Sequence, residues 1–179
     1  MIIHISGTPG SGKSTLGKKL SKMTNFKIIE TDLFVNDVDR KQRDKKKLLK
    51  KQKQFIFDIY KKKFNYYNKK HKNIIYVGIL SSSVPHGDLY TKQNFDLKIF
   101  YDPGLGNIIK RYYTREVKKG ILLRNKYIQM VIDGDWYIQS SGGIINSYQK
   151  DKKLHKKLKY KIMNEKEIIK IMRKLNRYI

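Results

Sequence analysis

Residues 7–14 of the chain are Gly7-Thr8-Pro9-Gly10-Ser11-Gly12-Lys13-Ser14, and they fit the pattern G-x-x-x-x-G-K-[ST] at every fixed position. The pattern predicts a phosphate-binding loop where a buried strand precedes it and a helix follows it. A mostly apolar run, Met1–Ile5, comes before the loop, and Leu16 and Leu20 follow it with the spacing of one helical face. The sequence therefore predicts the order strand, loop, helix.

The residue types of this stretch suit a triphosphate. Gly7, Gly10 and Gly12 tolerate backbone angles that allow successive N–H groups to face one anion. The N-terminus of the following helix adds its unpaired N–H groups and the positive end of its dipole. We expect Lys13 to bind the β- and γ-phosphates, Ser14 to offer its hydroxyl to Mg²⁺, and Thr15 to reach the α-phosphate.

Composition limits the class of protein. The chain has 179 residues, no cysteine and no apolar run of the roughly 20 residues that a bilayer span needs. Because the first strand begins at Met1, we expect no signal peptide and a soluble, intracellular, cytoplasmic protein without a membrane partner. One α/β domain over residues 1–179 is the expectation for this length.

The formal charge is +26, from 41 Lys and Arg against 15 Asp and Glu. A charge of this size is compatible with a nucleic-acid partner. The abundance of Lys, Ile, Asn and Tyr is also typical of an AT-rich coding sequence, which would spread lysine over every exposed surface. The sequence alone favours the second explanation.

Asp32 is the candidate acidic residue. It follows a predicted short strand, Phe26–Glu30, and in an open parallel sheet the carboxyl ends of the strands form the ligand-binding edge. A carboxylate at this edge can accept a proton from an attacking hydroxyl or hold a magnesium-bound water. The alternative is that Asp32 only caps the next helix.

Apolar residues at helical spacing predict a long helix or a helix pair within residues 37–72, where Arg40 and Arg43 could meet an acceptor. The nearly continuous apolar run Asn73–Leu80 predicts a buried central strand, without an acidic residue at its end. Gly78 in this run suggests close approach of backbone or ligand. In the loop that follows, His86 and Asp88 are weaker candidates for acceptor contacts.

The second half predicts a strand at Phe95–Tyr101 and a helix from Leu105 that places Arg111 and Arg115 on one face. Two guanidinium groups there suit a phosphate chain whose charge rises during transfer; pairing with Glu116 or solvent is the alternative. We further expect a helix from Ile144 to about Lys157, a last strand at Tyr160–Met163, and a closing helix. The spacing of Asn164 and Glu167 predicts a capping box for that helix.

The loop, Thr31-Asp32-Leu33-Phe34 and the paired arginines together resemble the nucleoside and nucleotide kinase-like branch of the P-loop NTPase superfamily, which includes adenylate kinase and uridine kinase. Asp32 with Phe34 is similar to the Asp-x-Phe of uridine-kinase-type enzymes, in which the Asp binds or deprotonates the acceptor hydroxyl. Arg111 and Arg115 match the lid arginines of that branch in position. Nucleoside monophosphate kinases typically have an Arg soon after the third strand, whereas Ile79-Leu80-Ser81 follows Gly78 here.

The resemblance implies a three-layer α/β fold with a mostly parallel five-stranded sheet flanked by helices. It also implies a helical substrate-side insert at about 36–72 and a lid-like region at about 104–140. The expected function is an ATP-dependent, Mg²⁺-requiring phosphotransferase that acts on a small hydroxyl- or phosphate-bearing acceptor, for which a nucleoside or nucleotide is the expectation. The expected site consists of ATP-binding residues, catalytic residues and metal ligands: Gly7, Thr8, Pro9, Gly10, Ser11, Gly12, Lys13, Ser14 and Thr15 for ATP; Lys13, Asp32, Arg111 and Arg115 for catalysis; Ser14 and Asp32 for the metal. A polynucleotide 5′-hydroxyl kinase and a non-catalytic nucleotide-binding protein are the alternatives.

Overall fold

The structure is a computed structural model that describes residues 1–37, 50–78, 93–118 and 143–177. The elements, in chain order, are β1 (Ile2–Ser6), α1 (Lys13–Ser21), β2 (Lys27–Glu30), the 3-10 helix η1 (Thr31–Asp37), α2 (Lys50–Lys70), β3 (Ile74–Val77), β4 (Leu97–Tyr101), α4 (Leu105–Lys118), α6 (Gly143–Lys157), β5 (Lys161–Met163) and α7 (Glu165–Leu175). None of the helices in these ranges has both the length and the hydrophobicity of a membrane span.

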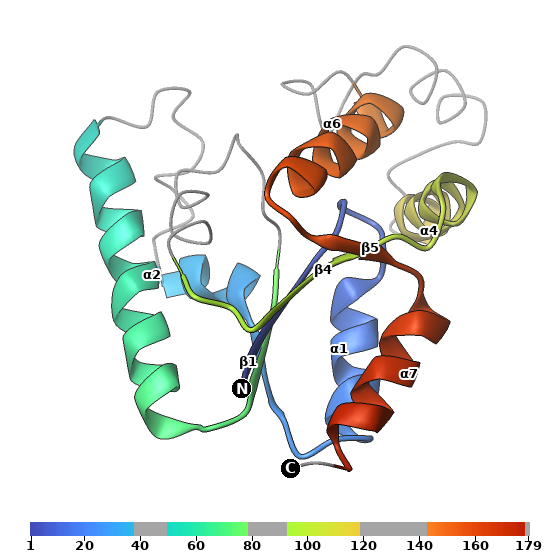
Figure 1. The fold of residues 1–179 in the computed structure, drawn as a ribbon. Coiled ribbons are helices and arrows are strands. Elements are labelled where there is room, and N and C mark those ends of the chain that lie inside the picture. The colour runs from blue at the N-terminus through green and yellow to red at the C-terminus, as the bar shows by residue number, and fades with distance from the viewer. Residues whose placement is uncertain (38–49, 79–92, 119–142, 178–179) are drawn as a thin grey trace.

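The five strands form one sheet in the order β2-β3-β1-β4-β5, and every pairing in it is parallel. In Figure 1 the strands run through the middle of the molecule, with α2 on one side and α1 and α7 together on the other. The α/β class with a five-stranded parallel sheet, expected from the sequence, is therefore confirmed.

Side-chain alternation along the strands builds a core on each face of the sheet. In β3, Ile74 and Tyr76 belong to the apolar cluster under α2, whereas Ile75 and Val77 belong to the cluster under α1 and α7. All four side chains are at most 1% exposed. This double burial explains the nearly continuous apolar run in the sequence, since a central parallel strand has helices on both faces.

The last helix begins as the sequence predicts. The Asn164 side chain accepts a hydrogen bond from the Glu167 N–H (3.1 Å), and the Glu167 carboxylate accepts one from the Asn164 N–H (2.8 Å). This is a complete capping box. Ile168 and Met172, one turn apart, are fully buried and hold α7 against the sheet face that it shares with α1.

Parallel pairing brings the carboxyl ends of all five strands to one edge. β1 ends at the glycine-rich loop, β2 at η1, β3 at Gly78, β4 at Asp102 and β5 at Asn164. The sequence predictions within residues 38–49, 79–92 and 119–142, among them Arg40, Arg43, His86 and Asp88, lie outside the described residues. Of the predicted insert at 36–72, the structure describes the last turn of η1 and α2; of the region at 104–140, it describes α4.

Candidate functional site

The glycine-rich loop has the backbone that its sequence predicts. Gly10 and Gly12 have φ angles of 83° and 84°, in the left-handed region that favours glycine. Gly12 is also the N-cap of α1, and no side chain caps this helix. The N–H groups of the first turn are therefore open to a ligand, as in phosphate sites at helix N-termini.

Two glycines of the loop leave no room for a side chain. A Cβ atom on Gly7 would lie 2.8 Å from the Ser11 hydroxyl oxygen and 3.0 Å from the Tyr101 carbonyl oxygen. A Cβ atom on Gly12 would lie 2.7 Å from a guanidinium nitrogen of Arg111. The loop is thus packed against the end of β4 on one side and against α4 on another.

A cavity of about 640 Å³ opens above the loop. Its lining residues come from the loop, α1, η1, β4, α4 and α7: Pro9, Gly10, Gly12, Lys13, Ser14, Thr15, Leu16, Lys19, Asp32, Tyr101, Arg111 and Glu165. Most of the residues predicted from the sequence are among them. Thr8 and Ser11 are instead fully buried.

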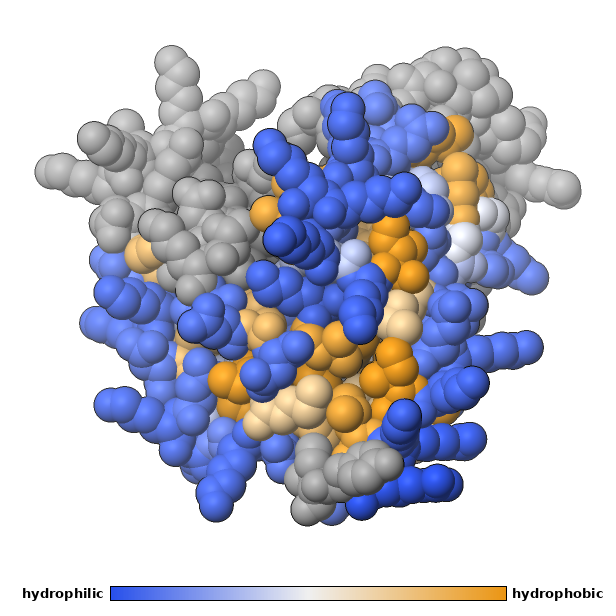
Figure 2. Space-filling model, in the orientation of Figure 1, coloured by the Kyte–Doolittle hydropathy of each residue, from blue (hydrophilic) through white to orange (hydrophobic). Residues whose placement is uncertain are grey.

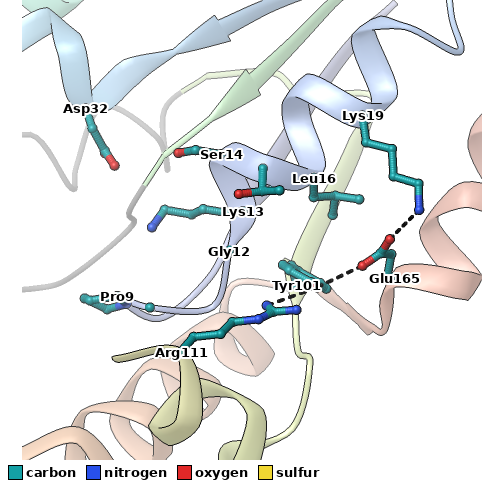
Figure 3. Close-up of a pocket in the computed structure, with 12 residues that line it drawn as sticks. Pro9, Gly12, Lys13, Ser14, Leu16, Lys19, Asp32, Tyr101, Arg111 and Glu165 are labelled. Atoms are coloured by element: carbon teal, nitrogen blue, oxygen red, sulfur yellow. Dashed lines mark hydrogen bonds and ion pairs between the residues drawn. The ribbon is translucent and has the colours of Figure 1, made fainter. Parts of the chain in front are cut away.

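Asp32 lies at one end of the cavity. Figure 3 shows its carboxylate and the Ser14 hydroxyl pointing toward the same space, with the Lys13 amine nearby. The 3-10 helix that contains Asp32 is fixed by its buried neighbour Thr31, whose hydroxyl donates to the Val77 carbonyl (3.3 Å) and whose carbonyl accepts from the Tyr60 hydroxyl (3.0 Å). Asp32 is therefore held at the edge of the sheet by two elements.

Gly78 permits this arrangement. A Cβ atom at position 78 would overlap the Thr31 hydroxyl oxygen and lie 3.2 Å from an Asp32 carboxylate oxygen. The close approach that the sequence suggested at Gly78 is thus an approach of η1 to the end of β3. Any larger residue there would push the Asp32 segment away from the sheet.

A chain of polar contacts forms the opposite end of the cavity. Arg111 donates to the Ser11 carbonyl and lies 3.5 Å from the Tyr101 hydroxyl, which in turn donates to Glu165 (3.4 Å). Glu165 also accepts from Lys19 at 2.7 Å, and this hydrogen bond lowers the pKa of its carboxyl. Both partners of the ion pair are partly exposed, so it contributes at most about 1 kcal/mol.

Sequence reasoning missed Tyr101, Glu165 and Lys19. Tyr101 is the last residue of β4, and Glu165 follows β5 after a single residue. The strand-end rule that selected Asp32 also applies to these two positions. For Arg115, the structure places the residue on α4, and its side chain lies outside the described part of the chain.

Known proteins resemble this chain in sequence and in fold. The family model described as "AAA domain" matches residues 3–98, more than half of the chain. The chain belongs to this family. Shikimate kinase of Clostridium botulinum (strain ATCC 19397 / Type A) is 30% identical over 134 residues, which cover 69% of this chain and 71% of that protein.

Solved structures share the fold at low identity. Deoxyadenosine kinase from M. mycoides, with products dCMP and a flexible dCDP bound, has a TM-score of 0.53 at 17% identity and covers 99% of this chain and 100% of its own. Shikimate kinase from Bacteroides thetaiotaomicron has a TM-score of 0.57 at 14% identity, covering 92% and 86%. The protein is a small-molecule P-loop kinase, as its sequence predicted.

Beneath its loop the kinase has a buried polar contact from α6. His155 is fully buried, its Nδ1 lies 2.6 Å from the Asp151 carbonyl oxygen, and its Nε2 lies 2.8 Å from the Ser6 hydroxyl. Because a carbonyl can only accept, Nδ1 carries the proton, and Nε2 accepts from Ser6. The neutral ring thus links α6 to the residue that enters the loop.

Three groups around this contact have shifted pKa values. Burial lowers the pKa of His155 to about 4 and holds that of His4 well below its usual value. Burial also raises the pKa of Asp151 to about 6, although the nearby Thr8 hydroxyl and the charge of Lys13 oppose the shift. The lowered histidine pKa values and the raised Asp151 pKa therefore affect stability in the same pH range.

The shifts predict how stability depends on pH. Between about pH 4 and 6 the unfolded chain protonates both histidines and ionises Asp151, whereas the folded chain does the reverse. The lowered histidine pKa values make stability fall as pH decreases through 6.5, and the raised Asp151 pKa makes it rise. Summed over these three groups, the unfolded chain binds one proton more than the folded chain. The free energy of unfolding therefore rises by about 1.4 kcal/mol for each unit of increasing pH.

Asp151→Asn removes the compensating group. The free energy of unfolding of the variant, relative to the parent, is expected to improve by about 2 kcal/mol between pH 4.5 and pH 7. Urea unfolding of both proteins across this range measures the difference. A difference that stays flat across this range would contradict the raised pKa of Asp151.

Proposed function

We propose that this kinase transfers the γ-phosphoryl group of ATP, in the presence of Mg²⁺, to a hydroxyl group of a small acceptor bound beside Asp32. The observation that supports this most strongly is the common orientation of Lys13, Ser14 and Asp32, which come from two separate segments and line one cavity. The phosphate-binding loop and the Asp32 carboxylate thereby face each other across the space in which phosphoryl transfer would occur.

In this proposal the residues from Gly7 to Thr15 bind the triphosphate through backbone N–H groups and the start of α1. Lys13, only 7% exposed, supplies its charge to the β- and γ-phosphates where little water screens it. Arg111 contributes positive charge from α4, and Arg115 would do so from the next turn. Charge held in place before the reaction stabilises the transition state without reorganisation.

The residues at the site fit a magnesium ion. Mg²⁺ prefers oxygen ligands and usually takes one or two from the protein, and the Ser14 hydroxyl and the Asp32 carboxylate both line the cavity. Bound between them and the nucleotide, the ion would neutralise charge on the phosphate oxygens. Asp32 can also accept the proton that the acceptor hydroxyl loses as it attacks phosphorus.

Two classes of acceptor have specific support. Deoxynucleosides agree with the Asp-x-Phe pattern at Asp32 and with the fold of deoxyadenosine kinase. Shikimate, a hydroxylated carboxylic acid, agrees with the curated relatives, which are shikimate kinases at 29–30% identity. Both present a hydroxyl group to phosphorus, so the proposed roles of Lys13 and Asp32 are the same for either.

A labelling assay tests the proposal. The purified protein, γ-labelled ATP and Mg²⁺ are incubated with shikimate, with each deoxynucleoside and its monophosphate, and with a 5′-hydroxyl oligonucleotide. We expect label in one of the small acceptors. Label in the oligonucleotide alone would favour a polynucleotide kinase, and nucleotide binding without any labelled product would contradict the acceptor classes proposed here.

A further inference from the structure

The outer face of α7 is a continuous basic surface. A groove of about 550 Å³ lies on it, lined by five cationic residues and one apolar residue: Lys166, Lys170, Arg173, Lys174 and Arg177, with Ile169. We call these six residues the α7 basic stripe. All five cationic residues are exposed. The four that lie on α7 recur at intervals of three and four, so they share one face of the helix, and Arg177 follows just past its end.

The charge of this stripe is not compensated within the part of the chain that the structure describes. The two acidic residues of α7 have other partners, because Glu165 binds Lys19 and Glu167 completes the capping box. No described acidic side chain forms an ion pair with a residue of the stripe. Like charges three and four residues apart on a helix repel one another, so the stripe costs some stability.

The stripe differs from a random scatter of lysine. Arg173 and Arg177 are two of only seven arginines in the whole chain, and guanidinium groups bind phosphate through two parallel hydrogen bonds. In Figure 2, which has the orientation of Figure 1, hydrophilic side chains project along the outer edge at the lower right, on the side of the molecule where α7 lies. An AT-rich coding bias explains lysine in general but not this arrangement.

The chemistry of the stripe selects the kind of partner. With Ile169 as its only apolar residue, the stripe cannot insert into a membrane as an amphipathic helix does. It has no aromatic residue on which the bases of a single strand could stack. The exposed cations from Lys166 to Lys174 instead extend over about 12 Å of helix, and their regular spacing matches a rigid row of phosphates, of which a duplex offers about seven over that length.

We propose that the α7 basic stripe binds the phosphate backbone of double-stranded nucleic acid without sequence preference. Ile168 and Met172 pack the opposite face of α7 into the core, so the stripe can make this contact on a rigid support. Apart from Glu165 at the start of α7, the residues that line the active-site cavity lie on other elements. Binding would therefore leave phosphoryl transfer unchanged.

The test compares two variants with the same loss of charge. One is Lys166→Gln/Lys170→Gln/Lys174→Gln in the stripe, and the other is Lys61→Gln/Lys62→Gln/Lys69→Gln at exposed positions of α2. Fluorescence anisotropy with a labelled 20-base-pair duplex gives the Kd of parent and variants from 50 to 200 mM salt. Since each phosphate contact contributes about 0.9 to the slope of log K against log salt, the stripe variant should lose about 2.7 from that slope.

At 100 mM salt we expect the stripe variant to bind at least tenfold more weakly than the parent, and the α2 variant to bind within about threefold of it. Equal weakening of both variants would overturn the proposal, because it would assign binding to the diffuse charge of the chain. Failure of the parent to bind the duplex, or tighter binding to vesicles with 30% phosphatidylserine than to the duplex, would also overturn it. Melting temperatures of the variants confirm that both are folded.

Discussion

Replacing Lys13 by methionine is expected to lower kcat about 10²- to 10³-fold, which corresponds to about 2.7–4 kcal/mol of transition-state stabilisation. Methionine keeps most of the length of the side chain, so the buried space is filled while the charge is lost. The charge of Lys13 is effective because the side chain is 7% exposed and lies in the same cavity as Ser14 and Asp32. The measurement is phosphoryl transfer to the acceptor that the labelling assay identifies.

Lys18→Met is the matched control, since Lys18 is on the same helix and is exposed to solvent. This variant should retain the parent kcat. A Lys13→Met protein with the parent kcat would contradict the proposed role of the loop. Equal losses in both variants, with lowered melting temperatures, would assign the effect to the stability of α1 and would equally contradict it.

The parts of the site that could be predicted depend on short segments. The loop and the start of α1 are adjacent in sequence, so one pattern of eight residues contains both the glycines and Lys13. Asp32 was found because a strand end is itself a local signal. The α/β fold with a five-stranded sheet was implied by the family resemblance, and the structure adds the sheet order β2-β3-β1-β4-β5.

The contacts that were not predicted join segments that are far apart in the sequence. Arg111 meets the Ser11 carbonyl across 100 residues, Lys19 meets Glu165 across 146, and His155 meets Ser6 across 149. Such contacts depend on how helices are placed over the sheet, which residue spacing does not specify. His155 in particular is a polar residue on a lysine-rich helix, and its burial follows only from the packing of α6 against the loop.

Gly78 is a local sequence signal that predicted a close contact but not its partner. A glycine in a buried strand indicates a close approach, but the sequence does not say which group approaches. The structure identifies that group as η1, with Thr31 in contact and Asp32 next to it. The sequence shows no acidic residue at the end of β3, and the space beside Gly78 is occupied by the segment that contains Asp32.

Asp32→Asn is expected to lower kcat about 10²- to 10⁴-fold, the range for loss of a general base. Asparagine has nearly the same shape, so η1 and its contacts with Val77 and Tyr60 through Thr31 should persist. The two proposed roles of the carboxylate differ in their response to Mg²⁺. Loss of a base alone leaves the Mg²⁺ concentration for half-maximal activity unchanged, whereas loss of a metal ligand raises it.

Titrating activity against Mg²⁺ for the parent and Asp32→Asn therefore assigns the role. Asp58→Asn, at an exposed position of α2 outside the cavity, should match the parent in both kcat and Mg²⁺ dependence. An Asp32→Asn protein that matches the parent in both would remove Asp32 from the mechanism, and the proton of the acceptor hydroxyl would then have to leave to solvent. Ser14→Ala in the same Mg²⁺ titration shows the effect of losing a metal ligand alone. The substitution removes a metal-binding hydroxyl without altering any group that can take up a proton at neutral pH.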